Sequence, residues 1–293
     1  MSLLACNAIP GWSDPVDADM EGSSSAVELT PRAERQNDPC FATEIAASPS
    51  RPVWTAGAAT TQCNVLEFDA GWLLTPMGDR VNQTLLPTSV RYGLTPRMDL
   101  RWGMPGPIRQ GGGDSAQLRG ITDQTFSVTY RFVEGSRRVP ALAVSYGLKD
   151  PHANPAKGFG TGFVDHQLSL IASRDLGRLH FDFNAVGTMA GCAKDRDGGV
   201  FFGMAMSRPV TRSLTWLVES EGGTQPGTED RYGAALSGVS WTIRPWLVAD
   251  AAYTRAYTAG APRSQITAGF TYARRSGFPP LARGSRVARW LGR

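Results

Sequence analysis

The feature that most constrains this chain is a strict alternation of apolar and polar residues. Its clearest copy is residues 86–104, which read LPTSVRYGLTPRMDLRWGM. Apolar or aromatic side chains stand at every second position, and the positions between them include Arg91, Asp99 and Arg101. A period of two places alternate residues on opposite faces of a strand, and the turn at residues 95–97 is short enough for a hairpin. The segment therefore predicts a β-hairpin with one apolar and one charged face.

The same pattern recurs along most of the chain and predicts twelve strands. Their connections alternate between long and short. Residues 105–120 and 149–162 are long and rich in Gly and Pro, whereas the turns at residues 134–137 and 175–177 are short. Outer membrane barrels have long external loops and short periplasmic turns, and strands of about ten residues suit a tilted crossing of a bilayer. We therefore predict an all-β fold: an antiparallel up-and-down transmembrane β-barrel of about 12 strands, with its long loops outside the cell.

Alternation alone does not say which face points inward. A soluble barrel or sandwich packs its apolar face inside, whereas a membrane barrel turns that face toward lipid. The apolar face here is nearly free of charge, and rings such as Tyr92 and Trp102 stand near strand ends, as in interfacial girdles. Twelve rows of large apolar side chains would also overfill a small core. These patterns favour the bacterial outer membrane, and a soluble β-sandwich or barrel that binds a ligand is the alternative.

Charge divides the chain into three parts. Residues 1–60 hold eight acids and three arginines without periodicity, which predicts a leader or a disordered N-terminal segment. Residues 61–273 form the predicted barrel domain. Residues 274–293 hold six arginines and no acid, and we expect a basic C-terminal tail. The barrel itself keeps only a small positive charge, which is too little for a nucleic-acid-binding surface.

No sequence pattern indicates a cofactor, a metal site or a catalytic group, so we predict that the chain is not an enzyme. His166 and Ser169 fall on opposite faces of one strand, which prevents the His–Ser pair that outer membrane lipases use. Cys63 and Cys192 are expected near opposite ends of the barrel, too far apart for a disulfide. The four cysteines form no C-x-x-C motif and are expected to be isolated small apolar residues: Cys6, Cys40, Cys63 and Cys192.

The functional candidates are charged residues of the polar face, which a membrane barrel turns into its lumen. Lone charges are costly in an apolar interior, so these should pair or meet water. Two interpretations stay open: the charges line a solute path and set its selectivity, or they brace a narrow barrel. The candidates are Glu67, Asp69, Arg91, Asp99, Arg101, Arg131, Asp165, His180, Asp182, Glu219 and Asp250.

The hairpins also resemble a known family. The runs RYGLTPRMDLRWG, TYRFVEGSRRVPALAVSYGL and FVDHQLSLIASRDLGRLHFDFNAVG, with a final AGFTY, are similar to the meta-pathway phenol-degradation-like (transporter-like) outer membrane proteins. The resemblance covers about residues 51–273. It implies an outer membrane β-barrel that passes small organic compounds, including aromatic or hydrophobic ones. We therefore predict a porin-like passive channel or transporter whose partners are membrane lipid and a small organic solute. A structural or adhesive barrel without transport is the alternative function.

Overall fold

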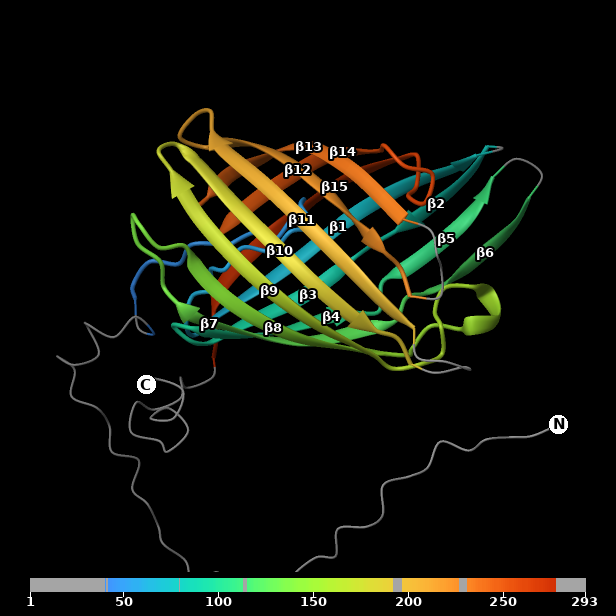
Figure 1. Ribbon diagram of the computed structural model, residues 1–293, viewed down its shortest axis with the longest axis horizontal. Helices are drawn as coiled ribbons and strands as arrows, with labels where there is room; N and C mark the ends of the chain where they lie inside the picture. The colour runs from blue at the N-terminus through green and yellow to red at the C-terminus, as the bar shows by residue number, and fades with distance from the viewer. Residues whose placement is uncertain are drawn as a thin grey trace, which may run out of the picture.

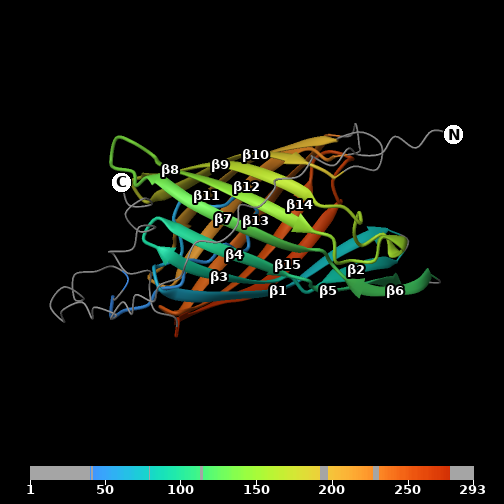
Figure 2. The ribbon, with the colours of Figure 1, turned by 90° about the horizontal axis from the view of Figure 1, so that it is seen from below.

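The computed structural model describes residues 40, 42–78, 80–112, 115–191, 197–226 and 231–277. Within them, fifteen strands form one antiparallel sheet, which closes because β1 (Val65–Gly78) pairs with β15 (Ser264–Arg275). Figures 1 and 2 show the resulting barrel with strongly tilted strands. No helix in the described ranges is both long and apolar enough to span a bilayer.

Twelve strands make the closed wall, and each pairs with its two neighbours in up-and-down order. The predicted fold class is therefore confirmed. The wall consists of β1, β3 (Thr88–Thr95), β4 (Met98–Met104), β7 (Gln124–Val133), β8 (Ala141–Asp150), β9 (Asp165–Leu176), β10 (Leu179–Met189), β11 (Gly198–Pro209), β12 (Leu214–Thr224), β13 (Arg231–Arg244), β14 (Leu247–Ala256) and β15.

Three further strands, β2 (Val81–Leu85), β5 (Pro107–Gly112) and β6 (Ser115–Ile121), extend the wall beyond this ring. β2 pairs with β1 and β5, and β5 pairs with β6, so the extension projects at the right of Figure 1. Breaks at residues 86–87 and 105–106 separate it from the wall, and each contains a proline, which cannot donate to a strand ladder. The prediction that residues 105–120 form a loop is therefore wrong. The alternation of β5 and β6 was not recognised because glycines interrupt it.

The apolar face of the wall points outward. Leu170 is 58% exposed and Phe202 59% exposed, whereas Glu67 is 0% and Asp69 2% exposed. Soluble proteins show the reverse, since their charged residues are almost never fully buried. A closed sheet with an apolar exterior and a polar interior is the arrangement of a transmembrane barrel.

The two ends of the barrel differ. β1 begins and β15 ends on the side of the short turns, at the left of Figure 1. The opposite end, the long-loop rim, carries the β2–β5–β6 extension and a loop with the short 3-10 helix η2 (Pro155–Lys157). The end with the short turns, where β1 begins, is here called the short-turn rim. It consists of residues 95–98, 134–140, 174–179, 208–213, 244–247 and 274–275.

Residues 42–62, here called the inner segment, lie inside the barrel without regular secondary structure. The segment starts at the short-turn rim, where Arg275 donates to the Ala42 carbonyl, and it returns there to Cys63, just before β1. The structure thus differs from the predicted N-terminal boundary, because residues 42–60 belong with the barrel. The segment has no alternation since it does not pair as a strand. Residues 1–39 of the predicted leader lie outside the described residues.

A disulfide joins Cys40 to Cys63, with their Cα atoms 4.6 Å apart. It closes the two ends of the inner segment at the short-turn rim. The expectation that these two cysteines are isolated apolar residues is wrong, because the inner segment turns back and brings its ends together. Cys6 and Cys192 lie outside the described residues.

Candidate functional site

The inner segment is held by side chains of the wall. Buried backbone N–H groups need acceptors, and this segment has no strand partner to supply them. Wall side chains of five strands supply them instead, so the segment follows the inner circumference of the barrel. The pairs, each from a backbone N–H to a side chain, are Ser48 to Glu67 of β1 (2.6 Å), Trp54 and Thr55 to Glu219 of β12 (2.9 and 2.6 Å), Ala56 to Asn184 of β10 (2.7 Å), Ala58 to Ser173 of β9 (2.7 Å) and Thr61 to Asp99 of β4 (2.8 Å).

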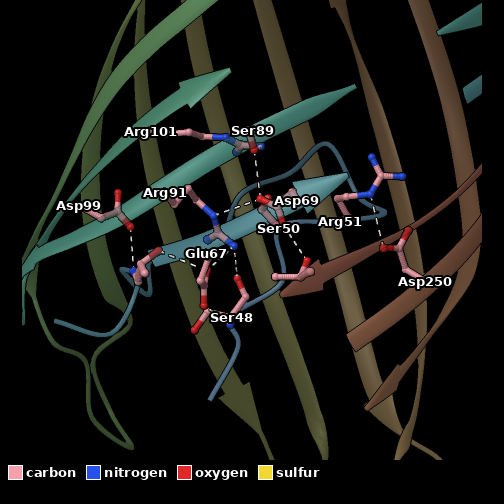
Figure 3. A network of polar contacts seen from close by, with 12 residues as sticks. Ser48, Ser50, Arg51, Glu67, Asp69, Ser89, Arg91, Asp99, Arg101 and Asp250 are labelled. Carbon is pink, nitrogen blue, oxygen red and sulfur yellow. Dashed lines mark hydrogen bonds and ion pairs between the residues drawn. The ribbon is translucent and has the colours of Figure 1, made fainter. Parts of the chain in front are cut away.

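A buried ion cluster on β1 and β3 fixes the first part of the inner segment (Figure 3). Arg91 Nη2 lies 2.6 Å from Glu67 Oε2, and its Nε lies 3.4 Å from Asp69 Oδ2. The same guanidinium donates to the Ser48 carbonyl at 2.5 Å. Asp69 also accepts from Thr271 at 2.6 Å. One cation therefore lies between two carboxylates while it donates to the inner segment. Hydrogen bonds of this charge-assisted kind are stronger than neutral ones.

A second ion pair holds Arg51 of the inner segment. Its Nε lies 3.4 Å from Asp250 Oδ2 on β14, and its Nη2 donates to Thr267 Oγ1 at 2.7 Å. The Asp250 side chain is 1% exposed, and no hydrogen bond from another described residue reaches its oxygens. Asp250 thus depends on Arg51 for neutralisation. Gly71 provides the space, since a Cβ there would lie 2.3 Å from Arg51 Nη2.

Glycines of the wall let the inner segment approach closely. A Cβ at Gly93 would stand 2.1 Å from the Gln62 carbonyl oxygen, and one at Gly203 would stand 2.1 Å from Thr55 Oγ1. A backbone hydrogen bond forms at the same place, from Asn64 N to the Gly93 carbonyl at 2.7 Å. At Gly93 the neighbour is backbone, which cannot move aside as a side-chain tip can. The glycine is therefore required by the inner segment.

Replacing Gly93 by alanine should destabilise the barrel by about 1–3 kcal/mol, the usual cost of overpacking. The measurement is urea unfolding in detergent, followed by the mobility shift of folded barrel on an unboiled gel. Gly147→Ala is the matched control, because a Cβ at this lumen-lining glycine meets nothing closer than 3.5 Å. Equal behaviour of the two variants would contradict the close packing of the inner segment on β3.

The structure brings eight of the eleven predicted residues together around the inner segment. Glu67, Arg91, Asp99, Glu219 and Asp250 contact it directly. Three more complete the group. Asp69 accepts from Ser50 Oγ at 3.5 Å, and Arg101 donates to Ser89, which in turn donates to Asp69. Asp182 accepts from Ser173 Oγ at 2.5 Å, and this hydroxyl accepts from Ala58 N. Most of these charges therefore face the inner segment and each other.

The other three candidates, Arg131, His180 and Asp165, form no hydrogen bond or ion pair with the described residues of the inner segment. Arg131 donates to the Pro96 carbonyl at the short-turn rim (2.9 Å). His180 stands between two carboxylates, with Nδ1 2.6 Å from Asp175 and Nε2 3.1 Å from Asp182. At the opposite end, Asp165 forms an ion pair with Lys149 at 2.6 Å. Arg131 and His180 lie near the short-turn rim and Asp165 near the long-loop rim, so these three residues do not meet in one site. His180 and Asp182 also line the cavity described below.

Sequence reasoning missed the whole inner segment and its uncharged partners Asn184 and Ser173. One signal was available in the sequence. The predicted lumen residues include seven acids against three arginines, so donors from another part of the chain were needed. The inner segment supplies them with Arg51 and with its backbone N–H groups.

A cavity of about 840 Å³ lies beside the inner segment. Its lining reaches Pro245 at the short-turn rim and Gln225 and Pro226 after β12, toward the long-loop rim. Trp54 of the inner segment, 54% exposed, lies on one side. The wall of β7, β8 and β9 presents hydroxyl and amide side chains to the cavity: Ser127, Thr129, Ser145, Gln167 and Ser169.

No protein-family model and no curated protein matches the sequence. Solved structures do match. An outer membrane channel from Pseudomonas putida F1 aligns with a TM-score of 0.59 and 13% identity, over 78% of this chain and 100% of that one. The KdgM porin aligns with a TM-score of 0.49 and 10% identity, over 70% and 98%. The fold is thus that of outer membrane β-barrel proteins, while the phenol-degradation-like family stays a prediction.

Proposed function

We propose that this protein is an outer membrane channel that passes small, uncharged organic solutes between the inner segment and the β7–β9 wall. The observation that carries the proposal is the cavity, whose lining extends from the short-turn rim toward the long-loop rim. Its hydroxyl and amide side chains can exchange hydrogen bonds with a passing solute without holding a charge. The apolar exterior supports a place in the membrane, with the short-turn rim in the periplasm.

The charges support the choice of uncharged solutes. Glu67, Asp69 and Asp250 are occupied by Arg91 and Arg51, and Glu219 is occupied by backbone N–H groups. The charged residues that line the cavity also have partners: Arg51 and Arg91 pair with these carboxylates, Asp99 accepts from Thr61 N, Arg101 donates to Ser89, and His180 contacts Asp182. Charges with partners attract ions weakly, so we expect selectivity to rest on size and hydrogen bonding. Aromatic compounds fit this class, as the sequence resemblance implies, and Trp54 offers a ring for stacking. The chemistry proposed here is passage without reaction.

A structural barrel without transport is the second candidate. The hydrogen bonds and ion pairs between the wall and the inner segment favour it. Glu219 is the discriminating residue, because it accepts from Trp54 N, Thr55 N and Thr55 Oγ1 at 2.6–2.9 Å. Alanine at this position leaves the buried Thr55 N–H and the part-buried Trp54 N–H without their acceptor. An unsatisfied buried N–H costs about 1–3 kcal/mol. The middle of the inner segment should then leave the wall and widen the path.

Single-channel recording in planar bilayers tests the two functions. The native protein should conduct weakly, and Glu219→Ala should conduct more strongly and admit larger uncharged solutes into liposomes. Glu134→Ala is the control, because this carboxylate is exposed at the short-turn rim and pairs only with Arg97 among the described residues. The outcome that favours the structural barrel is no current through either the native protein or Glu219→Ala, when the gel mobility shift shows that both are folded.

A further inference from the structure

The short-turn rim carries a positive charge that transport does not use. Among its described residues, ten arginines stand with two carboxylates, Glu134 and Asp175. Both carboxylates are engaged, with Arg97 at 3.1 Å and with His180 at 2.6 Å. Within the described residues, none of the other nine arginines forms an ion pair. The ten are Arg97, Arg137, Arg138, Arg174, Arg178, Arg208, Arg212, Arg244, Arg274 and Arg275.

These arginines surround the barrel instead of forming one patch. Every short turn of the described wall has at least one arginine in it or beside it, and β15 ends in two. Exposed apolar residues accompany them: Val139 is 48%, Leu176 52%, Val210 61% and Trp246 41% exposed. Trp246 packs edge-on against Tyr272, 5.6 Å between ring centroids. Aromatic and long cationic side chains at the edge of an apolar band are typical of a membrane–water interface.

The long-loop side is less one-sided. Among its described residues, six arginines, Lys149 and Lys157 stand with four carboxylates, Asp123, Asp150, Asp165 and Asp197. Lys149 is shared between Asp123 at 3.4 Å and Asp165 at 2.6 Å. Lys157 donates to the Arg119 carbonyl at 2.8 Å. The described cations thus outnumber the carboxylates five to one at the short-turn rim and two to one on the other side. The larger excess surrounds the short-turn rim, which points to an anionic partner around its circumference.

We propose that the rim arginines bind the phosphate groups of anionic phospholipids in the leaflet around the short-turn rim. A guanidinium can donate two parallel hydrogen bonds to a phosphate, which suits arginine better than lysine. A ring of sites matches lipids that surround the barrel, whereas an acidic protein would contact one side. The inference rests on the membrane location in the proposed function and is independent of transport.

Native mass spectrometry of the full-length protein tests this inference. The folded barrel is released from micelles that contain equal amounts of phosphatidylglycerol and phosphatidylcholine. The native protein should retain more phosphatidylglycerol. A rim variant should lose that excess, and a control variant with six long-loop-side replacements should keep it. The rim variant changes Arg137, Arg138, Arg178, Arg208, Arg212 and Arg244 to Gln, and the control changes Arg80, Arg109, Arg119, Arg231, Arg255 and Arg263 to Gln.

Three outcomes would overturn the inference: equal retention of both lipids by the native protein, equal loss in both variants, or displacement of the lipid by soluble glycerol phosphate at matching concentration. The last result would assign the arginines to free phosphate groups. If the rim variant does not fold, the dependence of lipid binding on salt can be measured on the native protein alone. The phosphatidylglycerol excess on the native protein should fall as ionic strength rises, since exposed charges are screened. An excess that ignores salt would contradict binding by these arginines.

Discussion

Replacing Arg91 by methionine should cost about 3–5 kcal/mol of unfolding free energy, because removing one partner strands the opposite charges inside the barrel. Glu67 and Asp69 would lose their shared cation in a place where their side chains are 0% and 3% exposed. Methionine keeps much of the apolar stem, so the loss reports the charge. The same change removes the bond to the Ser48 carbonyl and loosens the inner segment.

Urea titration in detergent micelles, read by the gel mobility of the folded barrel, measures this cost. Arg138→Met is the matched control, because this arginine is exposed in the β7–β8 turn. A surface change of this kind should stay within about 0.5 kcal/mol. If Arg91→Met costs no more than Arg138→Met, water reaches the two carboxylates and the inner segment does not seal them.

Placing arginine at Leu170 should destabilise the barrel by about 2–4 kcal/mol in lipid bilayers, the cost of a cation on the lipid face near the midplane. Leu170 is 58% exposed in the middle of β9 and pairs with Val144 and Ala185. In a bilayer this exposed surface meets hydrocarbon, where a guanidinium has no partner.

The adjacent residue provides the control for that change. Ser169 lies on the other face of β9 and lines the cavity, where an added guanidinium can meet water. Ser169→Arg should therefore cost less than Leu170→Arg in the same vesicles. The reverse order would place the apolar face inside the barrel and contradict a transmembrane arrangement.

The barrel could be predicted from the sequence because its strands carry the signal in their own residues. Alternation such as that of Leu168 and Leu170 against Gln167 and Ser169 marks the face of each strand, and turn lengths indicate the order. An even number of strands lets β1 and β15 close the wall as an antiparallel pair. β5 and β6 were missed because glycine gives neither face a side chain.

The inner segment could not be predicted in this way. Its structure depends on contacts between residues far apart in the chain, such as Thr55 with Glu219 and Arg51 with Asp250. Local periodicity contains no information on such pairs. The sequence indicated which charges face the lumen but left their role open, and the observed contacts show that most of them hold the inner segment.

The proposed function requires that solutes pass along the cavity beside the inner segment. Single-channel current through Ser169→Cys, before and after a charged methanethiosulfonate reagent, tests it most directly. The background replaces Cys6 and Cys192 by serine and keeps the Cys40–Cys63 disulfide. Leu170→Cys, facing outward, is the control. The reagent should reduce the current through Ser169→Cys and leave the current through Leu170→Cys unchanged. An unaltered current through a labelled Ser169→Cys barrel would contradict passage along the cavity.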